Sequence, residues 1–247
     1  MEKKHLVYGK HSSINIIKNQ NRRIEKILCT QNSLKFLQEN NAPQDKISLV
    51  DSKAIENILQ KNGYKNALHQ DVVVFTPRLR QPMINEILDD SKFLVLLDEL
   101  QDSQNIGAII RSAALFDADA IISTEHNSPD ENSHIIKAAC GAFEHIPFIK
   151  VVNPSQTIDL LKKNGFWVIG MSCDAKDTLQ NIAQKFSKNE KIAIIVGNEE
   201  KGMRKMTEKH CDFLVTIPLN AARGVDSLNA ASATAIFLYE INKIYCQ

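Results

Sequence analysis

The 247-residue sequence has few of the features that mark secreted, membrane or metal-binding proteins. Its five cysteines are odd in number and scattered, and the absence of a C-x-x-C pair argues against a disulfide framework or a cysteine-based zinc site. No apolar run approaches the roughly 20 residues that span a bilayer, and the first residues lack the apolar stretch of a signal peptide. We therefore expect a cytoplasmic protein with reduced thiols and no membrane partner.

Several catalytic and ligand-binding motifs are also missing. No G-x-G-x-x-G occurs, so an ordinary dinucleotide site is poorly supported, and no H-E-x-x-H or paired histidines indicate a metal. Cys140 lies near His134 and His145, but without an activating pattern we expect a small buried thiol there. Aromatic residues make up only 6% of the chain, so no stacking platform identifies a base as ligand.

A net charge of +1 conceals an uneven distribution of charge along the chain. Residues 1–80 carry 14 basic and 7 acidic side chains, a net charge of +7, whereas residues 81–247 carry 16 basic and 22 acidic ones, a net charge of −6. Such asymmetry indicates separate tasks for the two parts. The basic part would either contact phosphates or form a solvated lysine-rich surface, and charge alone does not decide between these.

A seam in the sequence lies around residues 76–83. Pro77 and Pro82, with two arginines, follow the apolar run 72–75, and proline is excluded from the centres of strands and helices. We predict a small basic α/β domain over residues 1–78, a linker over 79–91 and a second domain over 92–247.

The apolar patterns predict an α/β fold in both domains. In the first domain we expect helices at 14–18, 33–40 and 52–61, the last with Ser52 as its N-cap, and strands at 24–29, 46–50 and 71–75. In the second we expect strands at 93–97, 119–123, 148–152, 167–171, 192–196 and 213–217, alternating with helices at 105–116, 133–139, 156–163, 203–209 and 227–245. Strict alternation of this kind predicts a parallel sheet.

Because ligands of open α/β sheets bind at the carboxyl ends of the strands, the loops there are the candidates for a site. The first loop, residues 98–107, offers Asn105 as a helix cap and leads to Arg111, whose guanidinium suits a phosphate or carboxylate. The second, residues 197–202, has a glycine at each end. The third runs from Ile217 to Ser227, which we expect to cap the last helix. Each loop alone is equally compatible with an ordinary turn or cap.

The last helix carries an apolar stripe at three- and four-residue spacing, namely Leu228, Ala231, Ala235, Leu238, Ile241 and Tyr245. From the pattern alone, packing on its own sheet is favoured over a subunit interface.

Taken in order, the three loops resemble the three motifs of the SpoU (TrmH) family of RNA ribose 2′-O-methyltransferases, within the SPOUT superfamily. The matching stretches are Asn105-x-Gly107-x-x-x-Arg111, Gly197-Asn-Glu199-x-x-Gly202-Met203, and Ile217-Pro218 followed by Ser227-Leu228-Asn229. In addition, Gly9-Lys-His11 resembles the Gly-x-His opening of members that modify a guanosine of large-subunit ribosomal RNA.

The resemblance implies a catalytic domain with a deep trefoil knot that binds S-adenosylmethionine, and a homodimer built on the knot helices. By position, Gly197, Ile217 and Leu228 would contact this cofactor. Asn105, Arg111, Glu199 and Asn229 would surround the transfer site, with Ser227 nearby, and Arg111 would face the partner's cofactor. The implied substrate is structured RNA, with ribosomal RNA expected and DNA not.

The chemistry requires the ribose 2′-oxygen to be held in line with an activated methyl group while its proton is removed. A guanidinium stays protonated in proteins and is a poor base, so we expect Arg111 to clamp a phosphate and stabilise the developing alkoxide. Glu199 or a water molecule would then take the proton.

The stretch from Pro218 to Ser227 is about two residues longer than is usual in the family, which leaves the backbone contacts of residues 219–226 open. Three alternatives also stay open: a transfer RNA methyltransferase, a catalytically silent RNA-binding relative and an enzyme acting on a small nucleotide.

Overall fold

The computed structural model describes residues 5–220 and 227–246, which form two compact units. The first comprises residues 1–80 and 131–144, and the second comprises residues 81–130 and 145–247. The first boundary falls within the linker expected at 79–91. The segment 131–144, expected in the second domain, instead belongs to the first unit, so the chain passes between the units three times.

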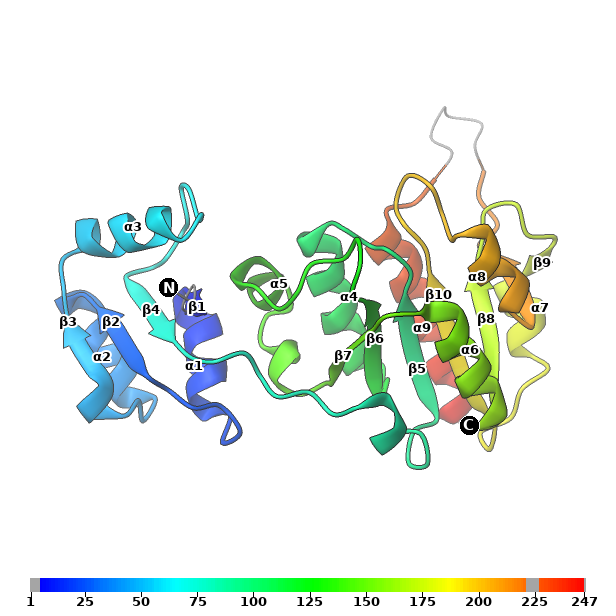
Figure 1. Cartoon of the computed structure of the whole chain (residues 1–247), viewed down its shortest axis with the longest axis horizontal. Helices are drawn as coiled ribbons and strands as arrows, with labels where there is room; N and C mark the ends of the chain where they lie inside the picture. Colours follow the sequence, from blue (N-terminus) through cyan, green and yellow to red (C-terminus); the bar gives the residue numbers. More distant parts are fainter. Residues whose placement is uncertain (1–4, 221–226, 247) are drawn as a thin grey trace. The chain divides into compact units, whose positions relative to one another are not determined.

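The first unit contains a four-stranded sheet in the order β1-β4-β2-β3 (Figure 1). β1 (Leu6–Tyr8) and β2 (Lys26–Cys29) pair antiparallel with β4 (Val72–Phe75), and β3 (Ile47–Leu49) pairs parallel with β2. Strand β1 was not predicted, because three residues are too few to show an alternating pattern. The remaining elements are α1 (Lys10–Lys18), α2 (Gln31–Glu39), η1 (Gln44–Lys46), α3 (Ser52–Lys61), α5 (Ser133–Ala138) and η3 (Ala142–Glu144).

Two predictions for the first unit are wrong in detail. Asp51, not Ser52, caps α3, since its carboxylate accepts a hydrogen bond from the backbone N–H of Ala54 at 2.6 Å. Cys140 is exposed rather than buried, because it follows the end of α5 in a left-handed conformation with φ of 50°.

Buried ion pairs hold the segment 131–144 in the first unit. The Arg22 guanidinium lies 2.7 Å from a Glu131 carboxylate oxygen and 2.8 Å from one of Glu144, and His5 Nε2 lies 3.0 Å from Glu131. Burial alone would raise the pKa of Glu131, but its hydrogen bond with His5 and the charge of Arg22 outweigh burial and hold that pKa below its ordinary value. Buried charges persist only when they are paired, so these contacts explain how α5 joins the first unit.

The second unit contains a seven-stranded sheet in the order β7-β6-β5-β10-β8-β11-β9, and every pair within it is parallel, as the alternation predicted. Its strands are β5 (Phe93–Leu97), β6 (Ala120–Thr124), β7 (Phe148–Val151), β8 (Phe166–Met171), β9 (Asp177–Thr178), β10 (Lys191–Val196) and β11 (Phe213–Thr216). Its helices are η2 (Ile84–Glu86), α4 (Ser103–Leu115), α6 (Pro154–Lys163), α7 (Leu179–Ala183), α8 (Lys205–His210) and α9 (Ala230–Tyr245). The short elements β9 and α7 were not predicted.

Helices cover both faces of this sheet (Figure 1). Leu94 and Leu96 of β5 share a core with Ile158 and Leu161 of α6. Because side chains alternate along a strand, the other residues of β5 face the opposite side, where α4 packs against α9. All five residues of β5 are buried, which explains its continuous apolar sequence.

Helix α9 is fixed to the rest of the second unit along one face. Its buried residues are Thr234, Phe237, Leu238, Ile241 and Ile244. The predicted stripe is confirmed at Leu238 and Ile241, whereas Leu228 precedes the helix and is exposed. The Tyr245 hydroxyl donates a hydrogen bond toward the backbone oxygens of Lys92 and Glu190, at 3.0 and 3.1 Å, near the starts of β5 and β10.

Within the described ranges, no helix is long and apolar enough to cross a membrane, and no group of three histidine, cysteine or acidic side chains is placed to hold a metal ion.

Candidate active site

The candidate site lies at the carboxyl edge of the second unit's sheet. Because all strands in this sheet are parallel, their carboxyl ends meet at one edge. The loops after β5 and β10 and the segment after β11 all start there, and these are the three loops that the sequence analysis selected.

Three polar side chains from these loops form a hydrogen-bonded chain. The Asn229 amide nitrogen donates to the Asn105 side-chain oxygen at 2.8 Å, and the Asn105 amide nitrogen donates to Glu199 Oε1 at 3.0 Å. Asn105 and Glu199 are 94 residues apart in sequence, and Asn105 and Asn229 are 124 apart. The fold thus brings together three of the five residues expected at the transfer site.

The N-cap of α9 determines which groups donate and which accept in this chain of hydrogen bonds. Asn229 is the N-cap, and its side-chain oxygen accepts hydrogen bonds from the N–H groups of Ala231 and Ser232 at 2.9 and 3.3 Å. Its amide nitrogen is therefore the end that faces Asn105, so Asn105 must accept with its oxygen and donate with its nitrogen. The expectation that Ser227 caps this helix is wrong, because the described helix begins three residues later.

Asn105 does not cap its own helix either. Asp102 is the N-cap of α4 and accepts a hydrogen bond from the Gln104 N–H at 2.9 Å. Asn105 lies in the first turn and is only 8% exposed. Because Asp102 caps α4, the Asn105 side chain can form hydrogen bonds with residues of the other two loops.

The loop after β10 folds into a tight turn. Asn198 and Gly202 exchange backbone hydrogen bonds of 3.0 and 2.9 Å, and the Asn198 side-chain oxygen accepts from the N–H groups of Glu200 and Lys201. A Cβ atom on Gly197 would lie 2.2 Å from the backbone nitrogen of Met203. The turn's own backbone fills the space on that side of Gly197, so only glycine fits at 197 and the turn can close tightly.

A buried carboxylate connects the first two loops. Asp98, which follows β5 and is 1% exposed, accepts hydrogen bonds from the backbone N–H of Arg204 at 3.1 Å and from its Nε at 2.9 Å. Arg204 Nη1 also lies 3.1 Å from Glu99, and the Asn198 amide donates to the Glu99 carbonyl at 3.0 Å. The sequence analysis gave Asp98 and Arg204 no role; a charged residue directly after a fully apolar strand was the available signal.

The remaining predicted residues lie on the elements that carry this site. Arg111 is exposed on α4, and Ser227 is exposed ahead of α9. Ile217 directly follows β11 and is half-buried, while Leu228 is 38% exposed. Residues 221–226 of the longer loop lie outside the described ranges.

These features describe an α/β unit whose candidate site combines a tight glycine turn, apolar side chains and an oriented carboxylate at the carboxyl edge of the sheet. Residues 92–239 match the model of the SpoU rRNA methylase family. The chain therefore belongs to that family.

Individual relatives agree with this assignment. The chain is 34% identical to the 23S rRNA (guanosine-2′-O-)-methyltransferase RlmB of Coxiella burnetii, over 98% of this chain and 97% of the relative. It is 35% identical to the protein of the same name from Escherichia coli K12, over 70% of this chain and 71% of that relative. The fold is similar to that of the SpoU methyltransferase AviRb from Streptomyces viridochromogenes, solved with AdoMet, with a TM-score of 0.79 at 21% identity over 98% of this chain and 90% of that one.

Proposed function

We propose that this protein transfers a methyl group from S-adenosylmethionine to the 2′-hydroxyl of a guanosine in 23S ribosomal RNA. The observation that carries the proposal is the chain of hydrogen bonds Asn229–Asn105–Glu199 at the sheet edge, in a sequence that is similar over nearly its whole length to a 23S rRNA (guanosine-2′-O-)-methyltransferase. The reaction would take place in the cytoplasm.

The residues at this edge fit S-adenosylmethionine. The tight turn that begins at Gly197 brings backbone polar groups to the sheet edge, where they would bind the polar parts of a nucleoside. Ile217 and the exposed Leu228 offer apolar surface for the adenine ring. When bound, the cofactor supplies a methyl group already activated by its sulfonium.

The protein's part in the reaction is to position the ribose and remove its proton. The Glu199 carboxylate is exposed, and Asn105 orients it, so Glu199 takes the proton from the 2′-hydroxyl directly or through a water molecule. Arg111 stays charged, holds the neighbouring phosphate and stabilises the alkoxide as it develops. Asn229 fixes Asn105, and Ser227 lies next to the ribose.

The first unit supplies the grip on structured RNA. Residues 1–80, nearly all of it, carry the net charge of +7, and such a charge attracts phosphates whatever the sequence of the RNA.

The active form is a homodimer built on α4 and α9. Leu115, Ile236 and Tyr239 on these two helices are 72%, 39% and 52% exposed, and the rings of Phe116 and Tyr239 lie 6.1 Å apart. Large exposed apolar groups on adjoining helices favour burial against another subunit. Arg111 lies one turn before Leu115 on α4 and would face the partner's site.

The C-terminal segment threads a trefoil knot. Support comes from the return of the chain: after β11 near one edge of the sheet, α9 packs against α4 and its Tyr245 reaches the starts of β5 and β10. The chain thus recrosses strands formed earlier, which agrees with the knot that the family resemblance implies.

The central experiment measures methyl transfer from labelled S-adenosylmethionine to total RNA, followed by mapping of the labelled nucleotide. We expect label at a guanosine 2′-oxygen of 23S RNA. Label in transfer RNA alone would overturn the ribosomal substrate, and no label with no cofactor binding would favour a silent relative.

The same assay tests Arg111 with Arg111→Lys, and Lys163→Arg at the exposed end of α6 serves as the control. We expect Arg111→Lys to lower kcat on the order of 100-fold, because a lysine cannot form the two-pronged contact with phosphate. Near-full kcat in Arg111→Lys would contradict both roles of this residue.

A further inference from the structure

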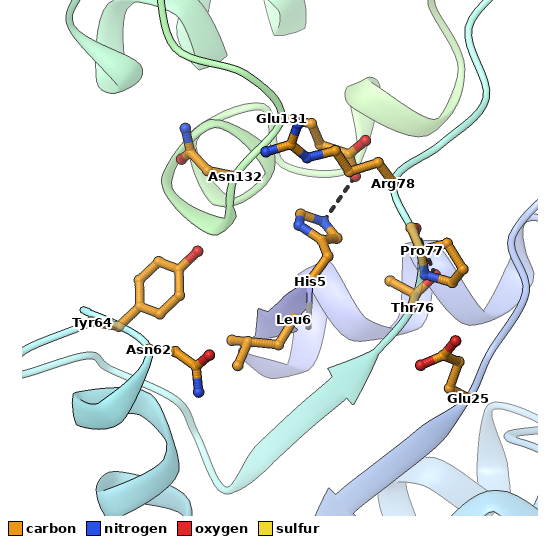
Figure 2. A pocket seen from close by; sticks show the side chains of 10 residues that line it. All are labelled: His5, Leu6, Glu25, Asn62, Tyr64, Thr76, Pro77, Arg78, Glu131 and Asn132. Atoms are coloured by element: carbon orange, nitrogen blue, oxygen red, sulfur yellow. Dashed lines mark hydrogen bonds and ion pairs between the residues drawn. The ribbon is translucent and has the colours of Figure 1, made fainter. Parts of the chain in front are cut away.

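The first unit contains a pocket of about 700 Å³, far larger than a packing defect and within the range of small-ligand sites. Figure 2 shows His5 and Leu6 between Tyr64 on one side and Thr76 with Glu25 on the other. All of its lining residues belong to the first unit.

A fixed aromatic ring forms one wall. Tyr64 packs edge-on against Tyr8, with ring centroids 5.3 Å apart, and lies 5.3 Å from the His134 ring. Its hydroxyl also accepts a long hydrogen bond, 3.5 Å, from the Ser133 N–H. Because these neighbours hold the ring, a flat ligand could stack against Tyr64 with little loss of side-chain entropy.

Three polar groups of the pocket offer hydrogen-bond acceptors, while the Arg78 side chain on its wall can only donate. The Asn62 amide nitrogen donates to the Ile58 carbonyl at 2.8 Å, which leaves its oxygen as an acceptor. The Thr76 hydroxyl donates to the Pro77 carbonyl at 3.1 Å and keeps its lone pairs. The exposed Glu25 adds a carboxylate. The pocket therefore suits a ligand that carries N–H groups together with an acceptor or a negative charge.

The other carboxylate in the pocket is already engaged. Glu131 contacts Arg22 at 2.7 Å and accepts from the Leu79 N–H at 2.8 Å. Its charge is neutralised within the protein, so it does not repel an anionic ligand.

The surface around the pocket is positive. The segments that carry Glu25, Tyr64 and Pro77 also carry exposed basic residues within two positions, namely Arg23, Lys26, Lys65 and Arg78. A flat ligand bearing N–H groups and attached to phosphates is a nucleotide, and unstacked RNA bases are recognised by aromatic stacking together with contacts to their polar edges.

We infer that this pocket binds one unpaired base of the RNA substrate, stacked on Tyr64, with its exocyclic amino group directed to Glu25 and Thr76. The inference rests on the proposed function, which makes RNA the substrate. Adenine, cytosine and guanine carry such an amino group and uracil does not, so the pocket discriminates against uracil.

The test measures binding of short single-stranded RNAs to the full-length protein by fluorescence anisotropy, using labelled hexanucleotides of A, C or U alone. We expect A and C oligonucleotides to bind several-fold more tightly than U. Tyr64→Leu should weaken binding of the A oligonucleotide by roughly 5- to 150-fold. Phe36→Leu, which removes another partly buried ring of the first unit, should have little effect.

A second pair of variants tests the polar contacts. Glu25→Ala should remove the preference over U, whereas Glu39→Ala, which deletes another exposed glutamate of the first unit, should keep it. Equal binding of all three oligonucleotides by the wild type, or equal losses in Tyr64→Leu and Phe36→Leu, would overturn the inference. Equally tight binding of adenosine 5′-monophosphate and the A oligonucleotide would also overturn it, in favour of a free-nucleotide site.

Methyl transfer by the wild type separates this inference from the proposed function. If the wild type methylates no RNA but its oligonucleotide binding depends on Tyr64, the proposed function is contradicted and the base-binding pocket is supported. If a folded Tyr64→Leu variant methylates subsaturating RNA normally, the base-binding role of the pocket is contradicted and the proposed function is not.

Discussion

At the scale of single residues, the contact between Asp98 and Arg204 determines how the first two loops meet. A carboxylate that is 1% exposed requires a partner, and Arg204 provides a backbone and a side-chain hydrogen bond. The same two loops carry Asn105 and Glu199, so this ion pair also sets the distance between the proposed base and the residue that orients it.

Arg204→Leu should lower the free energy of unfolding by about 3 kcal/mol, because it leaves a buried charge without its guanidinium. Adding Asp98→Asn should restore part of that loss, since the uncompensated charge is then gone. Urea unfolding of both variants measures this, with Lys205→Leu at the exposed neighbouring position as control. A double variant less stable than Arg204→Leu would contradict the explanation.

Glu131 should make the first unit sensitive to acid. Its pKa in the folded state lies below the ordinary 4.5, so its ionised form stabilises the fold above the unfolded-state pKa. That stabilisation is lost as pH falls through the folded-state pKa. Hydrogen exchange of β1 and α5 peptides between about pH 3 and about pH 7 should show opening at the acid end.

The matched variants for this prediction are Glu131→Gln and Glu39→Gln. The first should be less stable at neutral pH but lose less on acidification, whereas the second, with an exposed carboxylate, should keep the wild-type profile. An unchanged acid profile in Glu131→Gln would assign the effect to other carboxylates.

At the scale of elements, the turn after β10 depends on the absence of a side chain at position 197. In Gly197→Ala the new Cβ would lie 2.2 Å from the Met203 nitrogen and 2.4 Å from the Gly202 carbonyl carbon, so the turn must move. A displacement of about 1 Å should reduce methyl transfer on the order of 100-fold and weaken S-adenosylmethionine binding, as calorimetry would measure.

Gly63→Ala is the control for this substitution. Gly63 has a positive φ, 91°, which Gly197 does not, and a Cβ at position 63 would meet nothing within 4 Å. It should lose about 1 kcal/mol of stability from backbone strain and keep cofactor affinity. Equal cofactor binding by Gly197→Ala and the wild type would show that the turn adapts.

At the scale of the whole molecule, the exposed apolar residues of α4 and α9 should decide the oligomeric state. Tyr239→Lys should convert the proposed dimer into monomers, because burial of the lysine charge is unfavourable, and activity should fall with it if Arg111 serves the partner's site. Sedimentation velocity measures the change. Leu68→Lys, at a residue 69% exposed in the first unit, should remain dimeric. A monomeric wild type would contradict the proposed assembly.

Much of the second unit could be predicted from sequence. Strand β5 is fully buried and therefore uniformly apolar, and it was predicted with both ends correct. Alternating helices and strands imply a parallel sheet, and a parallel sheet places all carboxyl ends at one edge. The meeting of the loops that carry Asn105, Glu199 and Asn229 follows from the order of the elements.

The sequence by itself thus determined the α/β class, the family motifs and the edge at which the site lies, because these depend on local periodicity and on the order of elements. Only the tertiary structure decided that α5 joins the first unit, that Asp98 binds Arg204 and that Asn229 rather than Ser227 caps α9. Arg22 and Glu144 are 122 residues apart, and Asp98 and Arg204 are 106 apart. Pairing between such distant charges leaves no periodic trace in the sequence, since it depends on which buried groups the folded chain brings within a few ångströms.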